Sequence, residues 1–88
     1  MLHLITKIKK VNDNYSLICE FNTHESRLID LSEWVEQFRK ANDGWASKLS
    51  DINYFKSVKL DSYGTLSWEN KVDFCPDVLY DMSKPVGN

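Results

Sequence analysis

One alternating segment constrains the fold of this chain more than any other feature. Apolar side chains occupy every second position along it, at Tyr15, Leu17, Cys19 and Phe21. Because successive side chains of a strand point to opposite faces, the pattern predicts a half-buried strand with Cys19 facing inward. Turn residues bound this strand on both sides, and the segments 4–11 and 27–29 are predicted as strands too. The chain is therefore expected to begin with an antiparallel meander.

The next segment has the spacing of a helix. Its apolar residues follow the i, i+3, i+4, i+7 rhythm of one helical face, at Leu31, Trp34, Val35 and Phe38. Asp30 and Glu33 fit a capping box at its start, and the turn residues 42–44 fit its end. We therefore expect a helix over 31–40, with Trp34 and Phe38 in the core.

The second half of the chain predicts short elements separated by turns. A single-turn helix, two strands and a last helix are expected at 51–56, 58–60, 65–68 and 76–82. Pro76 suits the first position of the last helix, because the N–H that proline lacks would have no helical partner there. Trp68 ends a predicted strand and is expected in the core.

Together these elements predict an α+β fold, with a mainly antiparallel sheet of about five strands packed against one main helix plus short helices. The 88 residues suffice for one domain, which is expected to span 1–82. Residues 83–88, which include Pro85 and Gly87, are expected to form a flexible C-terminal tail.

Composition narrows the class of protein. The apolar share of 42% and the charged share of 27% are those of an ordinary globular chain. A net charge of −2 argues against a dedicated nucleic-acid binder, which usually carries a basic footprint. The N-terminal lysines follow a short apolar stretch instead of preceding it, so the pattern of a secretory signal peptide is missing. A cytoplasmic protein is expected.

Few residues suit catalysis or metal binding. A hydroxyl or thiol nucleophile needs a histidine beside it, and the chain offers only His3 near one end and His24 in a predicted turn. Structural zinc sites need converging ligands, commonly in close sequence pairs, whereas Cys19 and Cys75 belong to no such pair. We therefore predict that the protein is not an enzyme and has no catalytic residues, no metal and no cofactor.

Three features could serve binding instead. Asp73, Asp77 and Asp81 recur every four residues, in a stretch from Asp61 to Asp81 that holds five acidic residues and one basic residue. Separate structural roles are favoured for them, because Pro76 interrupts a shared helical face, and an acidic surface for a partner is the alternative. Trp45 follows Gly44 in a polar loop, where it either folds back onto the domain or meets a partner.

The third feature is the set of lysines on the first predicted strand, Lys7, Lys9 and Lys10. Strict alternation would place Lys7 and Lys9 on one face together with Ile5 and Val11. Lysines on an edge strand commonly block pairing with other chains, and this role is favoured. Contact with phosphates of a nucleic acid is the alternative.

The second half also carries a spaced pattern that ends in Trp68, Asp73, Pro76-Asp77 and Leu79-Tyr80. With this pattern the chain resembles the small bacterial family catalogued as domain of unknown function 2442. The resemblance implies a compact α+β domain, some of whose relatives carry a C-terminal helix-turn-helix and whose genes often lie near toxin–antitoxin-like or regulatory genes. It supplies no catalytic residues. Cys75 stands where relatives often have a serine that can cap the last helix.

These observations favour a non-enzymatic protein-interaction module, as an accessory or antitoxin-like component of a bacterial regulatory operon. Its partner would be an unidentified protein, and the domain itself a monomer or weak homodimer. The expected partner-binding residues are Trp45, Asp73, Asp77 and Asp81. The alternative is a nucleic-acid-associated transcriptional regulator that uses the basic first strand with Lys7, Lys9 and Lys10.

Overall fold

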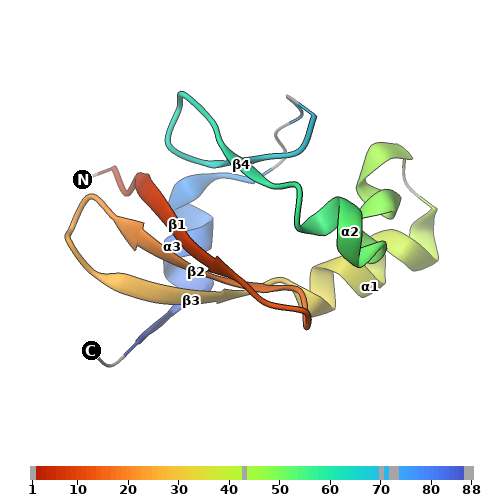
Figure 1. Cartoon of the computed structure of the whole chain (residues 1–88), viewed down its shortest axis with the longest axis horizontal. Helices are drawn as coiled ribbons and strands as arrows, with labels where there is room; N and C mark the ends of the chain where they lie inside the picture. Colours follow the sequence, from red (N-terminus) through yellow and green to blue (C-terminus); the bar gives the residue numbers. More distant parts are fainter. Residues whose placement is uncertain (1, 43, 70, 72–73, 87–88) are drawn as a thin grey trace.

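The computed structural model describes residues 2–42, 44–69, 71 and 74–86, and for Trp45 it describes the backbone alone. The predicted meander is confirmed by three antiparallel strands, β1 (Ile5–Val11), β2 (Ser16–Phe21) and β3 (Ser26–Asp30) (Figure 1). Cys19 of β2 is fully buried, as the alternation predicts. With the helices described below, these strands confirm the predicted α+β class.

The strands are divided between two sheets, where the sequence predicted one sheet of about five strands. A short strand β6 (Lys84–Pro85) pairs with β3 and completes a four-stranded sheet in the order β1-β2-β3-β6. The strands β4 (Lys59–Leu60) and β5 (Leu66–Ser67) form a separate hairpin. Part of the predicted tail is thus a strand, and the Val86 N–H continues the pairing by donating to the Ser26 carbonyl (3.0 Å).

Strand β1 departs from simple alternation. Its core-facing residues are spaced by three: Ile5, Ile8 and Val11. Register shifts interrupt the pairing with β2 at two places along β1, and each shift resets which side chains point inward. The three lysines between these core-facing positions, Lys7, Lys9 and Lys10, are all exposed. The expected sharing of one face by two lysines with Ile5 and Val11 is therefore wrong.

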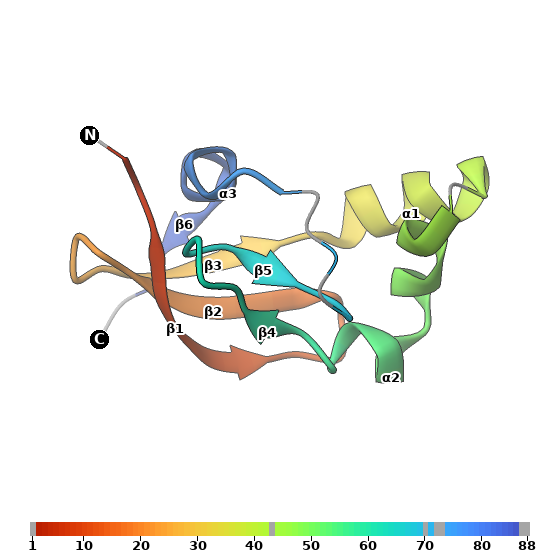
Figure 2. The same cartoon turned by 90° about the horizontal axis from the view of Figure 1, so that it is seen from above.

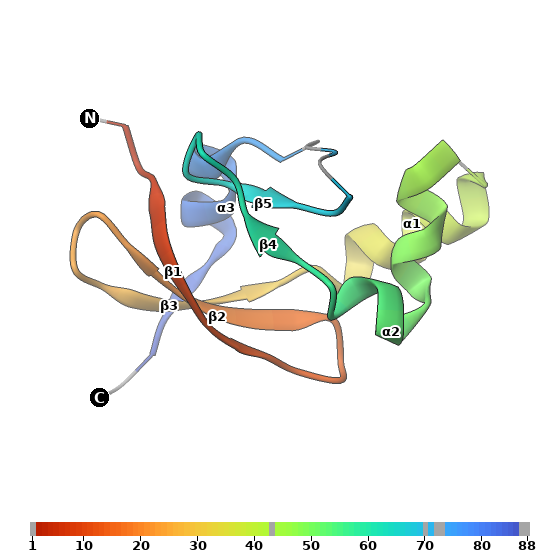
Figure 3. The same ribbon diagram turned by 45° about the horizontal axis from the view of Figure 1, so that its top comes forward.

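The helices occupy two places. After β3 the chain forms α1 (Ser32–Ala41), the 3₁₀ helix η1 (Gly44–Ser50) and α2 (Ile52–Phe55). Figures 1 and 3 show α1 and α2 together beyond one end of the four-stranded sheet, where α1 packs against η1. The last helix, α3 (Pro76–Met82), packs against β3. The main helix thus lies beyond the end of the sheet and not across its face.

The core lies between the four-stranded sheet and the β4–β5 hairpin, which covers the sheet when seen from above (Figure 2). Trp68 follows β5, is fully buried as predicted, and donates its indole N–H to the Phe55 carbonyl (2.9 Å). The rings of Phe55 and Phe74 flank it, with centroids 5.8 and 5.7 Å away. Leu79 extends the core to α3.

The helix ends follow from local hydrogen bonds. The residue before α1 is Leu31, so Asp30 does not form the expected capping box with Glu33; its Oδ1 instead accepts the Ser32 N–H (3.0 Å). Asn42 ends α1 in the left-handed conformation that asparagine tolerates (φ 50°). At α3, Cys75 makes no side-chain cap, as expected for a thiol.

Contacts at two places join the meander to the rest of the fold. Tyr15 packs edge-on against Phe55 (5.4 Å), and its hydroxyl donates to the Ser50 carbonyl, which links the meander to the helical end. At the other end, the Ile5 N–H donates to the Gly64 carbonyl in the turn of the β4–β5 hairpin (2.8 Å). The hairpin is thereby fixed over the edge strand β1.

Candidate functional site

One cluster of ionisable side chains contains residues from both ends of the chain. The His3 N–H and ring Nδ1 both contact Oδ1 of Asp77, at 2.7 and 3.0 Å. The His3 ring stacks on Tyr80, with centroids 3.7 Å apart and planes 14° apart. The Arg27 guanidinium carbon lies 4.3 Å from the centroid of the same ring. Because two groups this close to one centroid cannot share a face, His3 and Arg27 cover opposite faces of Tyr80.

The rest of the cluster satisfies the polar atoms of these residues. The Tyr80 hydroxyl donates to Glu25 Oε1 (2.5 Å), and Arg27 Nη1 donates to Glu25 Oε2 (2.8 Å). Arg27 also donates from Nε to Ser83 Oγ (2.6 Å) and from Nη2 to the Ser83 carbonyl (3.0 Å). We call this set the Tyr80 clasp; its members are His3, Glu25, Arg27, Asp77, Tyr80 and Ser83.

The electrostatics of the Tyr80 clasp are those of a structural network. Hydrogen bonds from the backbone N–H and ring of His3 lower the pKa of Asp77, and the Tyr80 hydroxyl is the main cause of a lowered pKa at Glu25. The same contact with Glu25 raises the pKa of Tyr80. Each charged group faces a partner within the clasp, and the three nitrogens of Arg27 are all engaged. The clasp therefore ties the N-terminal segment, β3 and α3 together.

Of the four sequence-predicted partner residues, the structure describes the side chains of Asp77 and Asp81 alone, one turn apart on α3. Asp77 belongs to the Tyr80 clasp, and Asp81 is exposed on α3. Asp73 and the side chain of Trp45 lie outside the described residues. Cys19 is enclosed in the core, where burial raises the pKa of its thiol to about 12, whereas Cys75 is exposed. Within 2–42, 44–69, 71 and 74–86 no three His, Cys, Asp or Glu residues gather as metal ligands.

The three lysines of β1 lie on the outer face of an edge strand. Lys9 donates from Nζ to Ser26 Oγ (2.9 Å), a contact that crosses β2 to reach β3. The other two, Lys7 and Lys10, point to solvent. This arrangement matches lysines that protect a sheet edge.

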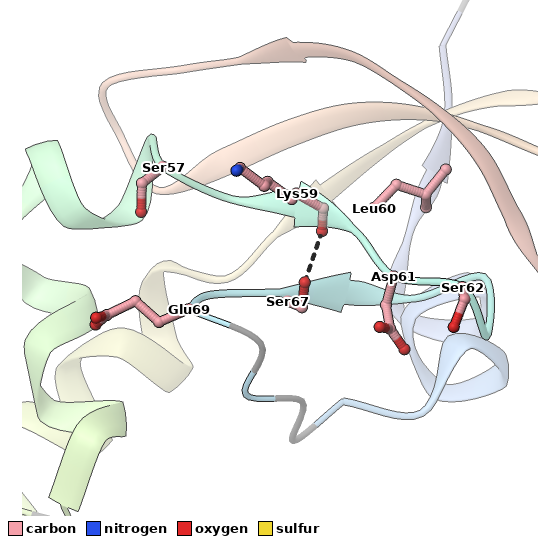
Figure 4. A pocket seen from close by; sticks show the side chains of 7 residues that line it. All are labelled: Ser57, Lys59, Leu60, Asp61, Ser62, Ser67 and Glu69. Atoms are coloured by element: carbon pink, nitrogen blue, oxygen red, sulfur yellow. Dashed lines mark hydrogen bonds between the residues drawn. The ribbon is translucent and has the colours of Figure 1, made fainter.

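A polar hollow of about 400 Å³ lies beside the β4–β5 hairpin (Figure 4). Its lining mixes hydroxyl, acidic and basic side chains: Ser57, Lys59, Leu60, Asp61, Ser62, Ser67 and Glu69. Figure 4 shows the Lys59 ammonium and the Asp61 carboxylate pointing away from each other, and Ser67 Oγ bonded to the Lys59 carbonyl (3.3 Å). The polar groups therefore do not converge on one ligand position.

An apolar hollow lies on α1, and the sequence did not predict it. Trp34 and Phe38 were expected in the core, but both are only half-buried, and among the described residues of α1 Val35 alone is buried. With Gln37 and Phe74 they line a groove of about 200 Å³, which we call the aromatic groove. The rings of Trp34 and Phe74 stack at 5.2 Å and 16°, and Phe38 lies 6.2 Å from Phe74. Helical spacing identifies this face but does not reveal how much of it is covered.

A second hollow shares Trp34 with the aromatic groove. It measures about 460 Å³ and is lined by Asp30, Ser32, Glu33, Trp34, Met82 and Lys84. We call it the α1–β6 hollow, after the two elements at its sides. Trp34 thus lines both an apolar hollow and a charged one.

The fold and its surfaces define a small α+β domain whose concave surfaces include an aromatic groove and two charged hollows. The chain belongs to the family described as protein of unknown function (DUF2442), whose model matches residues 10–85. The resemblance seen in the sequence is thereby confirmed. In the described part of the chain, no helix has the length and apolar character needed to cross a bilayer.

Similarity to characterised proteins is partial. A segment of 54 residues, 61% of this chain, is 33% identical to a transcriptional activator of sulfur metabolism from Saccharomyces cerevisiae. The matched segment covers 29% of that protein's length. No solved structure matches the chain.

Proposed function

We propose that this domain is a non-enzymatic protein-interaction module and that its partner binds the aromatic groove. The observation that carries the proposal is the stack of half-buried Trp34 on buried Phe74, which with Phe38 lines a groove of about 200 Å³. The groove is wide open to solvent, so an apolar side chain from another protein could pack against the exposed parts of these rings without entering an enclosed cavity.

The chemistry of the groove supports this role. Aromatic residues dominate the energetic centres of protein interfaces, because they bury much area while ordering few torsions. Trp34 and Phe38 lie one helical turn apart on α1, so the helix places both rings on the same side of the groove. Gln37 supplies an amide at its rim.

Within this proposal the protein is a cytoplasmic, bacterial accessory or antitoxin-like component of a regulatory operon. The support is the toxin–antitoxin-like or regulatory genes that the family resemblance implies nearby. This support is an association and not a physical argument. The surface that would act in this role is the aromatic groove. The partner-binding residues predicted from sequence, Trp45, Asp73, Asp77 and Asp81, stay a prediction beside this one.

A regulator that contacts nucleic acid through β1 is the second candidate. It is favoured by the exposure of Lys7, Lys9 and Lys10 along one edge strand and by the partial similarity to a transcriptional activator. Three lysines release few counterions, so binding at physiological salt would be weak. A gel shift that is lost on replacing Lys7 and Lys9 by Glu would establish this candidate.

Site-specific photo-crosslinking in the native host tests the proposal. A photoreactive amino acid at position 37 lies at the groove rim, and the same residue at the exposed position 36 provides a matched control on the opposite side of α1. We expect a discrete crosslinked protein from position 37 and not from position 36. Equal labelling from both positions, or labelling from position 36 alone, would exclude the aromatic groove as the binding site.

A further inference from the structure

The two hollows beside Trp34 differ in chemistry, and together they specify more than an apolar anchor. The aromatic groove is lined by three rings and one amide, whereas the α1–β6 hollow carries three charged residues. Trp34 borders both, so one bound segment that crosses the indole would reach both hollows. The lining of each hollow therefore indicates the chemistry of the partner group that would bind there.

Carboxylates dominate the charge of the α1–β6 hollow. Asp30 uses Oδ1 to accept the Ser32 N–H, which leaves its second oxygen for another donor. Glu33 is exposed and forms no ion pair within the described residues, unlike Glu36 on the same helix, which pairs with Arg39. Lys84 of β6 opposes them with a single positive charge. The lining is thus net negative and complements a cation.

Trp34 favours one kind of cation. Phe74 stacks against one side of the indole, and in the described part of the chain no other ring stacks on it. A planar guanidinium can stack on an indole face while it donates to a carboxylate, whereas an ammonium has no flat surface to stack. Arginine therefore fits the boundary between the two hollows better than lysine.

From this arrangement, and resting on the proposed function, we infer that the partner is a protein segment carrying an arginine close to a bulky apolar side chain. The apolar side chain occupies the aromatic groove beside Phe38 and Phe74. The arginine lies over Trp34 and donates to Glu33 and Asp30 in the α1–β6 hollow. A purely apolar segment, an acidic segment that would pair with Lys84, and a second copy of this chain are the competing occupants.

Short synthetic peptides test the inference without knowledge of the partner. The probes are capped peptides that share one Leu and place Arg, Lys, Ala or Glu one to four residues away. They are titrated into the ¹⁵N-labelled protein, and the indole N–H signals and the amides of α1 are followed. We expect the best Arg peptide to bind about five- to tenfold more tightly than its Ala equivalent, the size of an exposed ion pair plus a cation–π contact. Lys should fall between Arg and Ala, and Glu should bind most weakly.

Matched variants assign the effect to the hollow. Glu33→Gln should reduce the preference for Arg over Ala about two- to threefold and leave the Ala peptide unchanged. Asp30→Asn provides a second test, and well-dispersed amide signals show that either variant is folded. Lys84→Gln should strengthen Arg binding slightly or leave it unchanged, since it removes the opposing charge.

The outcomes separate this inference from the proposal beneath it. If Ala and Glu peptides perturb the groove residues as strongly as the Arg peptide does, the inference of a partner arginine is wrong. The proposal that a partner binds the aromatic groove is then unaffected. Concentration-dependent shifts at the groove without peptide would identify a second copy as the occupant and also overturn the inference. If Arg peptides bind but perturb only residues away from the groove, and Trp34→Ala binds them normally, both the inference and the proposed function fail.

Discussion

Trp68 and Trp34 are neighbours of the same ring, yet they belong to regions with opposite properties. Trp68 contacts Phe74 edge-on, is fully buried, and has its indole N–H bonded to the Phe55 carbonyl. Trp34 stacks on Phe74 and remains half-buried on α1. The first stabilises the packing of the hairpin on the sheet, and the second lines a groove. A continuous aromatic cluster can therefore serve the fold at one end and present a surface at the other.

Truncation of the two tryptophans should give the largest difference between the regions. Trp68→Ala should cost about 3–5 kcal/mol in free energy of unfolding, because it empties a fully enclosed site. Trp34→Ala should cost about 1–2 kcal/mol, because part of its surface already faces solvent. This revises the sequence-based expectation, which placed Trp34 and Phe38 in the core. Urea unfolding of both variants measures the difference, and Trp68→Phe serves where the alanine variant does not fold.

Equal losses in the free energy of unfolding for Trp68→Ala and Trp34→Ala would contradict the comparison of the two tryptophans. They would mean that Trp34 is as enclosed in solution as Trp68, and the aromatic groove would then be closed.

Two described glycines with left-handed backbone extend the comparison to the turn of the β4–β5 hairpin and to the helical end of the molecule. At Gly64 (φ 77°) an added Cβ would lie 2.9 Å from the Leu4 Cβ, whereas at Gly44 (φ 59°) it would meet open space. Gly64→Ala should cost about 2–4 kcal/mol, from backbone strain plus overpacking against Leu4. Gly44→Ala should cost about 1–2 kcal/mol from backbone strain alone. A larger loss at Gly44, by thermal or urea unfolding, would place the tighter packing at the helical end.

Removal of the Tyr15 hydroxyl tests the link between the β1–β3 meander and the helical end of the molecule. The hydroxyl donates to the Ser50 carbonyl, and the ring stays packed on Phe55 when Tyr15 is replaced by Phe. Tyr15→Phe should cost about 1 kcal/mol, the usual net value of one hydrogen bond. Amide hydrogen exchange should accelerate in η1 and α2 and not in the meander. Uniform acceleration through the whole chain would show that the two regions open together.

The smallest expected effect is the pH dependence that Asp77 contributes. Contacts from His3 lower the pKa of Asp77 in the folded state, so its carboxylate stabilises the fold above the unfolded pKa of about 4. This contribution is lost as the pH falls through the lower, folded pKa. Asp77→Asn should therefore be less stable than the parent at pH ~6 and approach it below pH ~3. A constant difference at all pH values would show that the His3–Asp77 contact does not depend on the carboxylate charge.

What could be predicted from sequence depends on whether a feature is local. The strand around Cys19 and the helix around Trp34 follow from the spacing of apolar residues, and both are present. The two register shifts in β1 produce a spacing of three that no standard periodicity describes. The two-residue strand β6 depends on a distant partner, β3, and contains a proline that argues against a strand.

The candidate sites were less predictable than the fold. His3 and Asp77 meet although they are separated by almost the whole chain, and neither has a local signature for that contact. The i, i+4 spacing of Trp34 and Phe38 predicted a helix face but not its partial exposure, because only the placement of Phe74 and Met82 decides what covers it. Surfaces made by distant segments require the tertiary structure.

The central claim, that the aromatic groove binds the partner, is tested most directly by the affinity of the crosslinked partner for Trp34→Ala. The comparison uses isothermal titration of the parent, Trp34→Ala and the control Lys40→Ala. We expect Trp34→Ala to weaken binding by about 30-fold or more, the effect of an interface hot spot, and Lys40→Ala to bind like the parent. Normal binding by a folded Trp34→Ala variant would contradict the account.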